Sequence, residues 1–145
     1  MKGARIAGHP VHPALVHFPV ALWSVTWVWD ALGAYTGAAV WWQTGFWCLM
    51  AGTVMAAPAV ITGVMEFIAL EKAHPAENIA VRHMLLMGTA FAVYAGELVI
   101  RGGPLAPEGW RLYAALSLST AGVALLAVGG WYGGRMVYQY GMGRD

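Results

Sequence analysis

The residues of this sequence best suited to chemistry are its histidines, and three of them fall within one short stretch. The segment GHPVHPALVHFP contains His9, His12 and His17 together with three prolines, at the start of a long apolar run. A further histidine, His83, lies near the start of the third apolar run. Imidazole is a frequent ligand of metal ions and of haem iron, so these residues are the first candidates for a cofactor site.

His17 and His83 are expected at similar depth in two helices that run in the same direction. Each lies a few residues beyond the start of its apolar segment. An ionisable residue inside a membrane segment indicates function by default, and two such histidines can hold a haem iron from both sides. We therefore predict haem b with His17 and His83 as axial ligands, and with Arg82 and Arg135 beside the haem propionates.

Two other interpretations of the same region stay open. A bare iron, copper or zinc ion could be bound by the same pair of histidines, with His9, His12 and Glu66 as alternative ligands. The polar groups could equally form a cofactor-free network in an accessory or scaffold subunit of a larger membrane complex. The sequence leaves open whether the protein is an enzyme.

The remaining ionisable residues of the apolar segments are expected to have structural roles. Asp30 lies near the opposite end of the first segment from His17, where it would be structural or solvated. Glu97 and Arg101 are four residues apart, a spacing that favours pairing on one helix.

The elements that must position these residues are membrane helices. The chain has 145 residues, of which 59% are hydrophobic and 10% charged, whereas soluble domains contain roughly 25% charged residues. About 20 apolar residues suffice to span a bilayer. Short links join the apolar segments, which favours an all-α, up-down four-helix bundle in a single transmembrane domain. The helices are predicted at about residues 13–35, 40–71, 77–101 and 108–140.

The distribution of basic residues predicts the orientation of this bundle. Cytoplasmic loops of membrane proteins are enriched in lysine and arginine. One end of the bundle would carry Lys2, Arg5, Lys72, Arg82, Arg135 and Arg144, and the other Arg101 and Arg111. Both termini are therefore expected in the cytoplasm. With a net charge of +1 and no basic cluster, nothing indicates nucleic-acid binding. No internal repeat is evident from the sequence.

The opening motif is similar to that of a known family. HPVHPALVHFP resembles the HPxHPxxVHFP signature of small bacterial four-helix integral membrane proteins classed as a domain of unknown function. The segments TGVMEF, RHMLLM and GWYGGRMVYQYGMG resemble further, looser family motifs, so the likeness spans nearly the whole chain. Two positions depart from the family pattern: Arg135 stands in place of a glutamate and Tyr140 in place of a histidine.

The resemblance implies redox work in a bacterial inner membrane. Some members of that family are fused to Rieske-type or cytochrome c-like domains. By analogy, the chain is expected to be a multi-pass membrane protein that transfers single electrons. Its partners would be membrane lipid, a quinone or a redox protein, and it could form a homo-oligomer or join a larger complex.

Overall fold

The structure, a computed structural model, describes residues 5–71 and 73–143 and is built from long helices. Ahead of the first helix, a short antiparallel hairpin pairs two strands of two residues each, β1 (Arg5–Ile6) and β2 (His9–Pro10). The helices are α1 (Val11–Thr36), α2 (Ala39–Ile68), α3 (Glu77–Arg101) and α4 (Trp110–Tyr140). Each of the four is long and apolar enough to span a membrane, which confirms the predicted fold class. Three of the basic residues used to predict the orientation lie outside the described residues: Lys2, Lys72 and Arg144.

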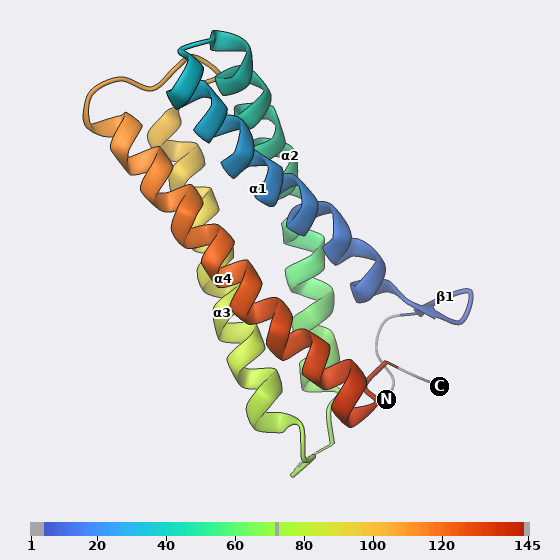
Figure 1. Cartoon of the computed structure of the whole chain (residues 1–145). Helices are drawn as coiled ribbons and strands as arrows, with labels where there is room; N and C mark the ends of the chain where they lie inside the picture. The colour runs from blue at the N-terminus through green and yellow to red at the C-terminus, as the bar shows by residue number, and fades with distance from the viewer. Residues whose placement is uncertain (1–4, 72, 144–145) are drawn as a thin grey trace.

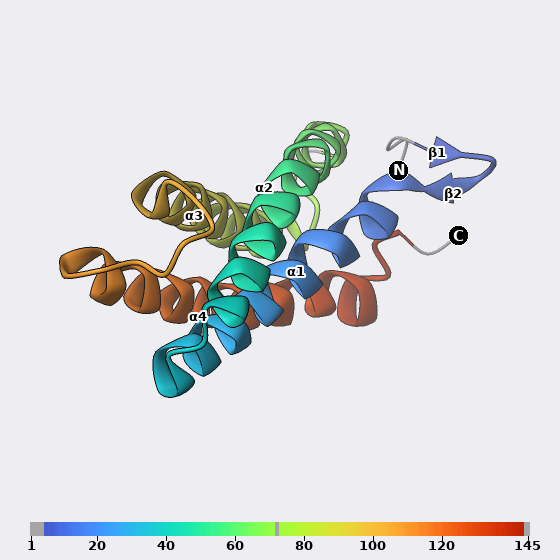
Figure 2. The same ribbon diagram turned by 90° about the horizontal axis from the view of Figure 1, so that it is seen from above.

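The helices are arranged as two hairpins. In Figure 1, α1 packs along α2 and α3 packs along α4, and these are the most extensive contacts between elements. The hairpins meet through smaller contacts of α1 with α4 and of α2 with α3. Seen from above, the two pairs cross rather than lie parallel, as Figure 2 shows. α1 begins and α4 ends at the same end of the bundle.

Local sequence explains where these helices begin and end. Within a bilayer the backbone must satisfy its own hydrogen bonds, and long helices do so. Gly37 and Gly102 stop α1 and α3 in the left-handed conformation, with φ of 70° and 65°, which glycine adopts without steric cost. α1 begins at Val11, two residues earlier than predicted, so Pro13 falls in its first turn, where proline is tolerated.

The buried residues of α1 recur in α3 at a constant offset of 71 residues. Four of the five buried residues of α1 have a buried counterpart at this spacing in α3. The pairs are Pro19 with Ala90, Trp23 with Tyr94, Thr26 with Glu97, and Asp30 with Arg101. The inward faces of the two helices therefore have the same rotation and register.

The buried residues of α2 recur in α4 in the same way, at an offset of 70 residues. Every buried residue of α4 has a buried counterpart in α2. The pairs are Gly45 with Ala115, Leu49 with Ser119, Gly52 with Gly122, Ala56 with Leu126, and Ala59 with Gly129. The bundle is thus two copies of one hairpin related by an approximate two-fold axis along the helices. This repeat was not evident in the sequence.

Equivalent residues meet each other where the hairpins face across this axis. Trp23 and Tyr94 stack with ring centroids 4.5 Å apart and an interplanar angle of 14°. At one end of the bundle, Nη1 of Arg101 lies 2.8 Å from Oδ1 of Asp30. We call the end of the bundle that contains Asp30 and Arg101 the carboxylate end. The opposite end, which holds His12 and His83, is called the histidine end. The stacked rings belong to the central apolar core, with Leu49, Ala56, Ala90 and Leu126.

Small residues let the central rings fit between the helices. A Cβ atom at Gly52 would lie 2.8 Å from Cδ1 of Trp23, and one at the equivalent Gly122 would overlap the ring of Tyr94. Space at these positions is therefore filled by aromatic side chains rather than left for a ligand.

Gly122→Ala is accordingly expected to lower the free energy of unfolding by about 1–3 kcal/mol, the usual cost of overpacking a core. Gly130→Ala is the matched control on the same helix, because no atom lies within 4 Å of its added methyl group. Thermal unfolding in detergent would measure both variants. Equal stability of the two would contradict the packing described here.

Candidate functional site

His12 is held between α1 and α2 at the histidine end. Its Nδ1 atom lies 2.9 Å from the carbonyl oxygen of Ala59 and 3.3 Å from Oγ1 of Thr62. The imidazole packs on Gly63, where an added Cβ would lie 2.8 Å from Cε1 of the ring. The first helix, predicted at about residues 13–35, would leave His12 outside it. Instead the helix begins one residue before it, and the ring is half-buried against α2.

His83 is held between α3 and α4 by an equivalent set of contacts. Its Nδ1 atom lies 2.8 Å from the carbonyl oxygen of Gly129. The ring packs on Gly133, where an added Cβ would lie 3.1 Å from Cε1. In both hairpins the histidine bonds one carbonyl and packs on the glycine four residues further along. His12 and His83 are themselves 71 residues apart, so they are equivalent residues of the repeat.

These contacts leave both rings ready to act as ligands. A carbonyl oxygen can only accept, so the Nδ1 atom of each neutral ring must carry the proton and donate it. The lone pair then lies on Nε2, the arrangement found in histidines that bind metals. Within the described residues, neither Nε2 atom of His12 or His83 makes a hydrogen bond. An imidazole nitrogen of this kind is a common ligand of haem iron.

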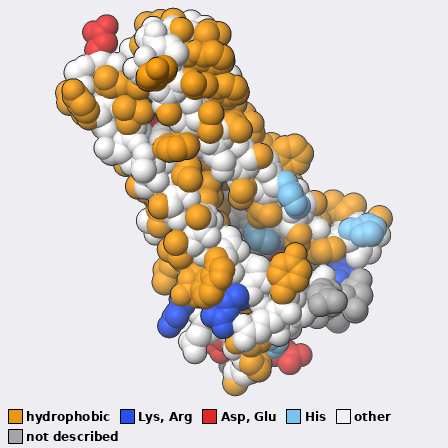
Figure 3. Space-filling view, viewed as in Figure 1, with side chains coloured by type: hydrophobic (Ala, Val, Ile, Leu, Met, Phe, Trp, Pro, Cys, Tyr) orange, Lys and Arg blue, Asp and Glu red, His pale blue; other side chains and the backbone are white. Residues whose placement is uncertain are grey.

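Figure 3 shows where the histidine side chains lie on the surface. They gather on the half of the molecule near the histidine end, and pale-blue surface is also visible in the hollow between α1 and α4. The region where the two hairpins face each other is therefore lined by imidazole on the side from which α1 begins.

His17 lies on a different face of α1. It is exposed, and it lies five residues beyond His12, which corresponds to a rotation of about 140° on a helix with 3.6 residues per turn. Depth alone suggested that His17 would oppose His83, but rotation directs it away from the buried stripe. The residue whose contacts match those of His83 is therefore His12, and ligation by His17 and His83 stays a prediction. His9 is exposed on β2, outside the helices.

The arginines predicted to accompany a cofactor lie at the histidine end, on the α3–α4 hairpin. Arg82 is exposed and donates from Nη1 to the hydroxyl of Tyr132 over 3.4 Å. Arg135 donates from Nε to Oε1 of Gln139 over 2.9 Å, and its guanidinium lies 5.0 Å from the ring centroid of Trp131.

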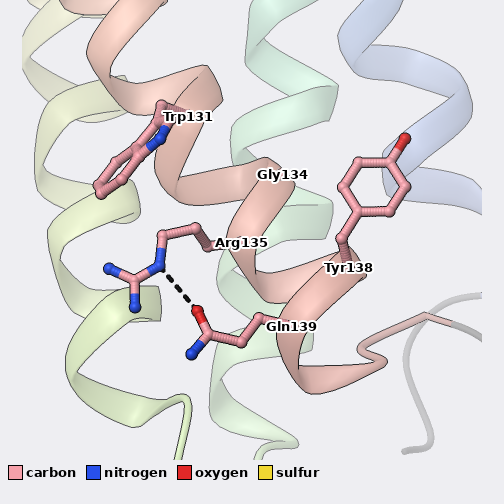
Figure 4. Close-up of a pocket in the computed structure, with 5 residues that line it drawn as sticks. All are labelled: Trp131, Gly134, Arg135, Tyr138 and Gln139. Atoms are coloured by element: carbon pink, nitrogen blue, oxygen red, sulfur yellow. Dashed lines mark hydrogen bonds between the residues drawn. The ribbon is translucent and has the colours of Figure 1, made fainter.

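Figure 4 shows Arg135 within a shallow depression on the side of α4. The depression has a volume of about 290 Å³ and is lined by residues of α4 alone: Trp131, Gly134, Arg135, Tyr138 and Gln139. Arg135 therefore interacts with side chains of its own helix.

Glu66 is half-buried near the end of α2, and no hydrogen bond or ion pair involves it within the described residues. The part of the chain that the structure describes brings together no three histidine, cysteine, aspartate or glutamate side chains able to hold a metal ion. A bare-metal site built from His17, His83 and Glu66 is therefore not assembled among these residues.

A second polar site lies at the carboxylate end and was missed by the sequence analysis. All four helices contribute to it. Arg101 binds both carboxylate oxygens of Asp30 through Nη1, at 2.8 and 2.9 Å, and donates from Nη2 to the carbonyl oxygen of Trp42 over 2.8 Å. Ser119 lies 3.2 Å from Oδ2 of Asp30 and 2.9 Å from Oε1 of Glu97. Asp30, Glu97 and Ser119 are fully buried.

Sequence signals for this second site existed. Asp30 is the only acidic residue in its apolar segment, and an ionisable residue at such a position marks function or buried pairing. The expected pairing of Glu97 with Arg101 within α3 exists, with Oε1 and Nη1 at 3.7 Å, but it is the weaker of the two ion pairs. The closer partner comes from α1, 71 residues away, which spacing along one helix cannot show.

Comparison with known proteins places the chain in one family. Residues 8–145 match the model of a family described as predicted membrane protein (DUF2231). No curated protein and no solved structure matches the chain.

Proposed function

The chain belongs to the DUF2231 family of predicted membrane proteins, and we propose that it is a membrane-embedded electron-transfer protein that holds haem b between His12 and His83. The observation that carries the proposal is that the two imidazole rings make equivalent contacts. Each hairpin orients one imidazole with a backbone carbonyl and packs it on a glycine, and no described residue bonds its Nε2.

The matched contacts distinguish a ligand pair from two isolated polar residues. A histidine with no ligand role in a membrane helix needs only one hydrogen bond, from its ring N–H group. Two equivalent histidines, each fixed through Nδ1 within its own hairpin, are what a cofactor bound between the hairpins would need from its protein. His12 and His83 would hold the haem iron, and the haem would supply one-electron chemistry there.

The other residues of the histidine end would bind the edges of the cofactor. Arg82 is exposed at this end and Arg135 is half-buried, so both guanidinium groups could turn from their present partners to carboxylates at the membrane surface. Gly63 and Gly133 keep the space beside the rings free of side chains.

The cellular setting belongs to the same proposal. The excess of basic residues at the histidine end favours a cytoplasmic location for that end. A multi-pass protein of a bacterial inner membrane would then exchange electrons with a quinone or a redox protein at this surface. The HPxHPxxVHFP motif, which supplies His12, supports this placement through its resemblance to families with fused redox domains.

An absorption spectrum of the purified protein tests the proposal. We expect sharp reduced-minus-oxidised haem bands in the wild type, either as isolated or after addition of haem b. The bands should be lost in His12→Ala and in His83→Ala, because each variant removes an axial ligand.

His17→Ala is the matched control, since it removes an exposed imidazole from the same helix. Its spectrum should be unchanged. Bands that vanish in His17→Ala but persist in His12→Ala would reverse the ligand assignment. A wild-type protein that stays colourless with added haem b would refute the haem proposal. Circular dichroism would establish that each variant is folded.

A further inference from the structure

The carboxylate end contains more acid than base. Arg101 carries one positive charge, and the side chains of Asp30 and Glu97 would carry two negative charges if both were ionised. All three side chains are fully shielded from solvent. A net charge in such surroundings is costly, and a carboxyl group there takes up a proton instead. One proton on the two acids would make the cluster neutral.

The hydrogen bonds of Ser119 also require this proton. Its hydroxyl oxygen lies within bonding distance of a carboxyl oxygen of Asp30 and of one of Glu97. A serine hydroxyl has a single hydrogen, so it can donate to only one of them. The other contact is favourable only if that carboxyl group is protonated and donates to Ser119.

Glu97 is the better holder of the proton. Asp30 receives two hydrogen bonds from Arg101, whereas Glu97 lies 3.7 Å from the same guanidinium. The ionised form of Asp30 is therefore the better stabilised. Within the described residues, Oε2 of Glu97 is buried and has no hydrogen-bond partner. Protonation makes this carboxyl group neutral, so that no charged oxygen is left there without a donor.

Two further orphaned atoms lie on the same face of α3. The hydroxyl of Tyr94 and Nε of Arg101 are buried and make no hydrogen bond within the described part of the chain. Tyr94, Glu97 and Arg101 follow one another at helical spacing and share the buried face of α3. Buried polar atoms without protein partners are the usual places for internal water.

We propose that the carboxylate end is a proton-binding site, in which Glu97 holds one exchangeable proton between Asp30 and Ser119. Release of the proton converts the carboxylic acid of Glu97 to a carboxylate, with water as the proton acceptor. The charged and titratable groups that face Glu97 are Asp30 from α1 and Tyr94 and Arg101 from its own helix; α4 presents Ser119 and α2 the carbonyl of Trp42. The inference does not depend on haem.

Infrared spectroscopy of the whole protein in detergent tests this site. At neutral pH the wild type should show the carbonyl stretch of a protonated carboxylic acid, shifted in heavy water. Glu97→Gln should remove this band. Glu66→Gln, which changes a half-buried glutamate of α2, should leave it in place. Absence of the band from the wild type, or its persistence in Glu97→Gln, would overturn the proposal.

Asp30→Asn provides a second test that keeps the glutamate. Once Asp30 is neutral, Glu97 becomes the only available counter-ion for Arg101 and should ionise. The protonated-acid band should therefore disappear in Asp30→Asn as well, although Glu97 is still present. Retention of the band in this variant would contradict the charge balance on which the proposal rests.

Discussion

Arg101→Met is expected to destabilise the folded protein by about 3–5 kcal/mol, the cost of removing one partner from a buried ion pair. The guanidinium is fully shielded, binds both oxygens of Asp30 and also satisfies the carbonyl of Trp42. Methionine fills similar space but leaves Asp30 and Glu97 without a cation. Chemical or thermal unfolding in detergent would measure the loss.

Two companion variants separate charge from packing. Asp30→Asn/Arg101→Met removes both charges, so it should recover much of the lost stability. Asp30→Asn alone should cost less than Arg101→Met, because Glu97 lies 3.7 Å from the guanidinium and can replace the missing negative charge. If the double variant were as unstable as Arg101→Met, the loss would arise from packing rather than from an unpaired charge.

Tyr94→Ala is expected to lower stability by about 3–5 kcal/mol, as for other large aromatic side chains removed from a core. Tyr94 is fully buried and stacks on Trp23, the equivalent residue of the other hairpin. Truncation would remove the contact that joins the hairpins at the middle of the bundle and would leave a cavity beside Gly122.

Tyr94→Phe is the matched control for this substitution. The hydroxyl has no hydrogen-bond partner within the described residues, so its removal should change stability by less than about 1 kcal/mol. A double-mutant cycle with Trp23→Ala would isolate the stacking contribution, expected at about 0.5–1.5 kcal/mol. A large loss in Tyr94→Phe would show instead that the hydroxyl has a partner of its own, such as an internal water.

Much of the fold could be predicted from the sequence because hydrophobic length is a direct physical signal. Runs of about 20 apolar residues have few alternatives to membrane helices. The predicted spans at 77–101 and 108–140 agree closely with α3 and α4. Short links then leave an up-down bundle as the simplest arrangement, and the structure has it.

The internal repeat could not be recognised in the same way. Between the buried faces of α1 and α3, the equivalent residues are Trp23 and Tyr94 or Asp30 and Arg101, which share a position but not a side chain. Opposite charges are favoured at equivalent positions because the two residues face each other across the axis. Sequence similarity between the repeats is lost at these positions because the two side chains in contact must be complementary rather than identical.

The sequence by itself determined the membrane class, the four spans and the concentration of histidine at one end of the bundle. It did so because apolar length and residue type act locally. Only the tertiary structure decided that His12 is the residue equivalent to His83 and that Asp30 pairs with Arg101. Those choices depend on how each helix is rotated about its own axis and aligned with its neighbours. Rotation and register are set by packing between hairpins, which no single segment encodes.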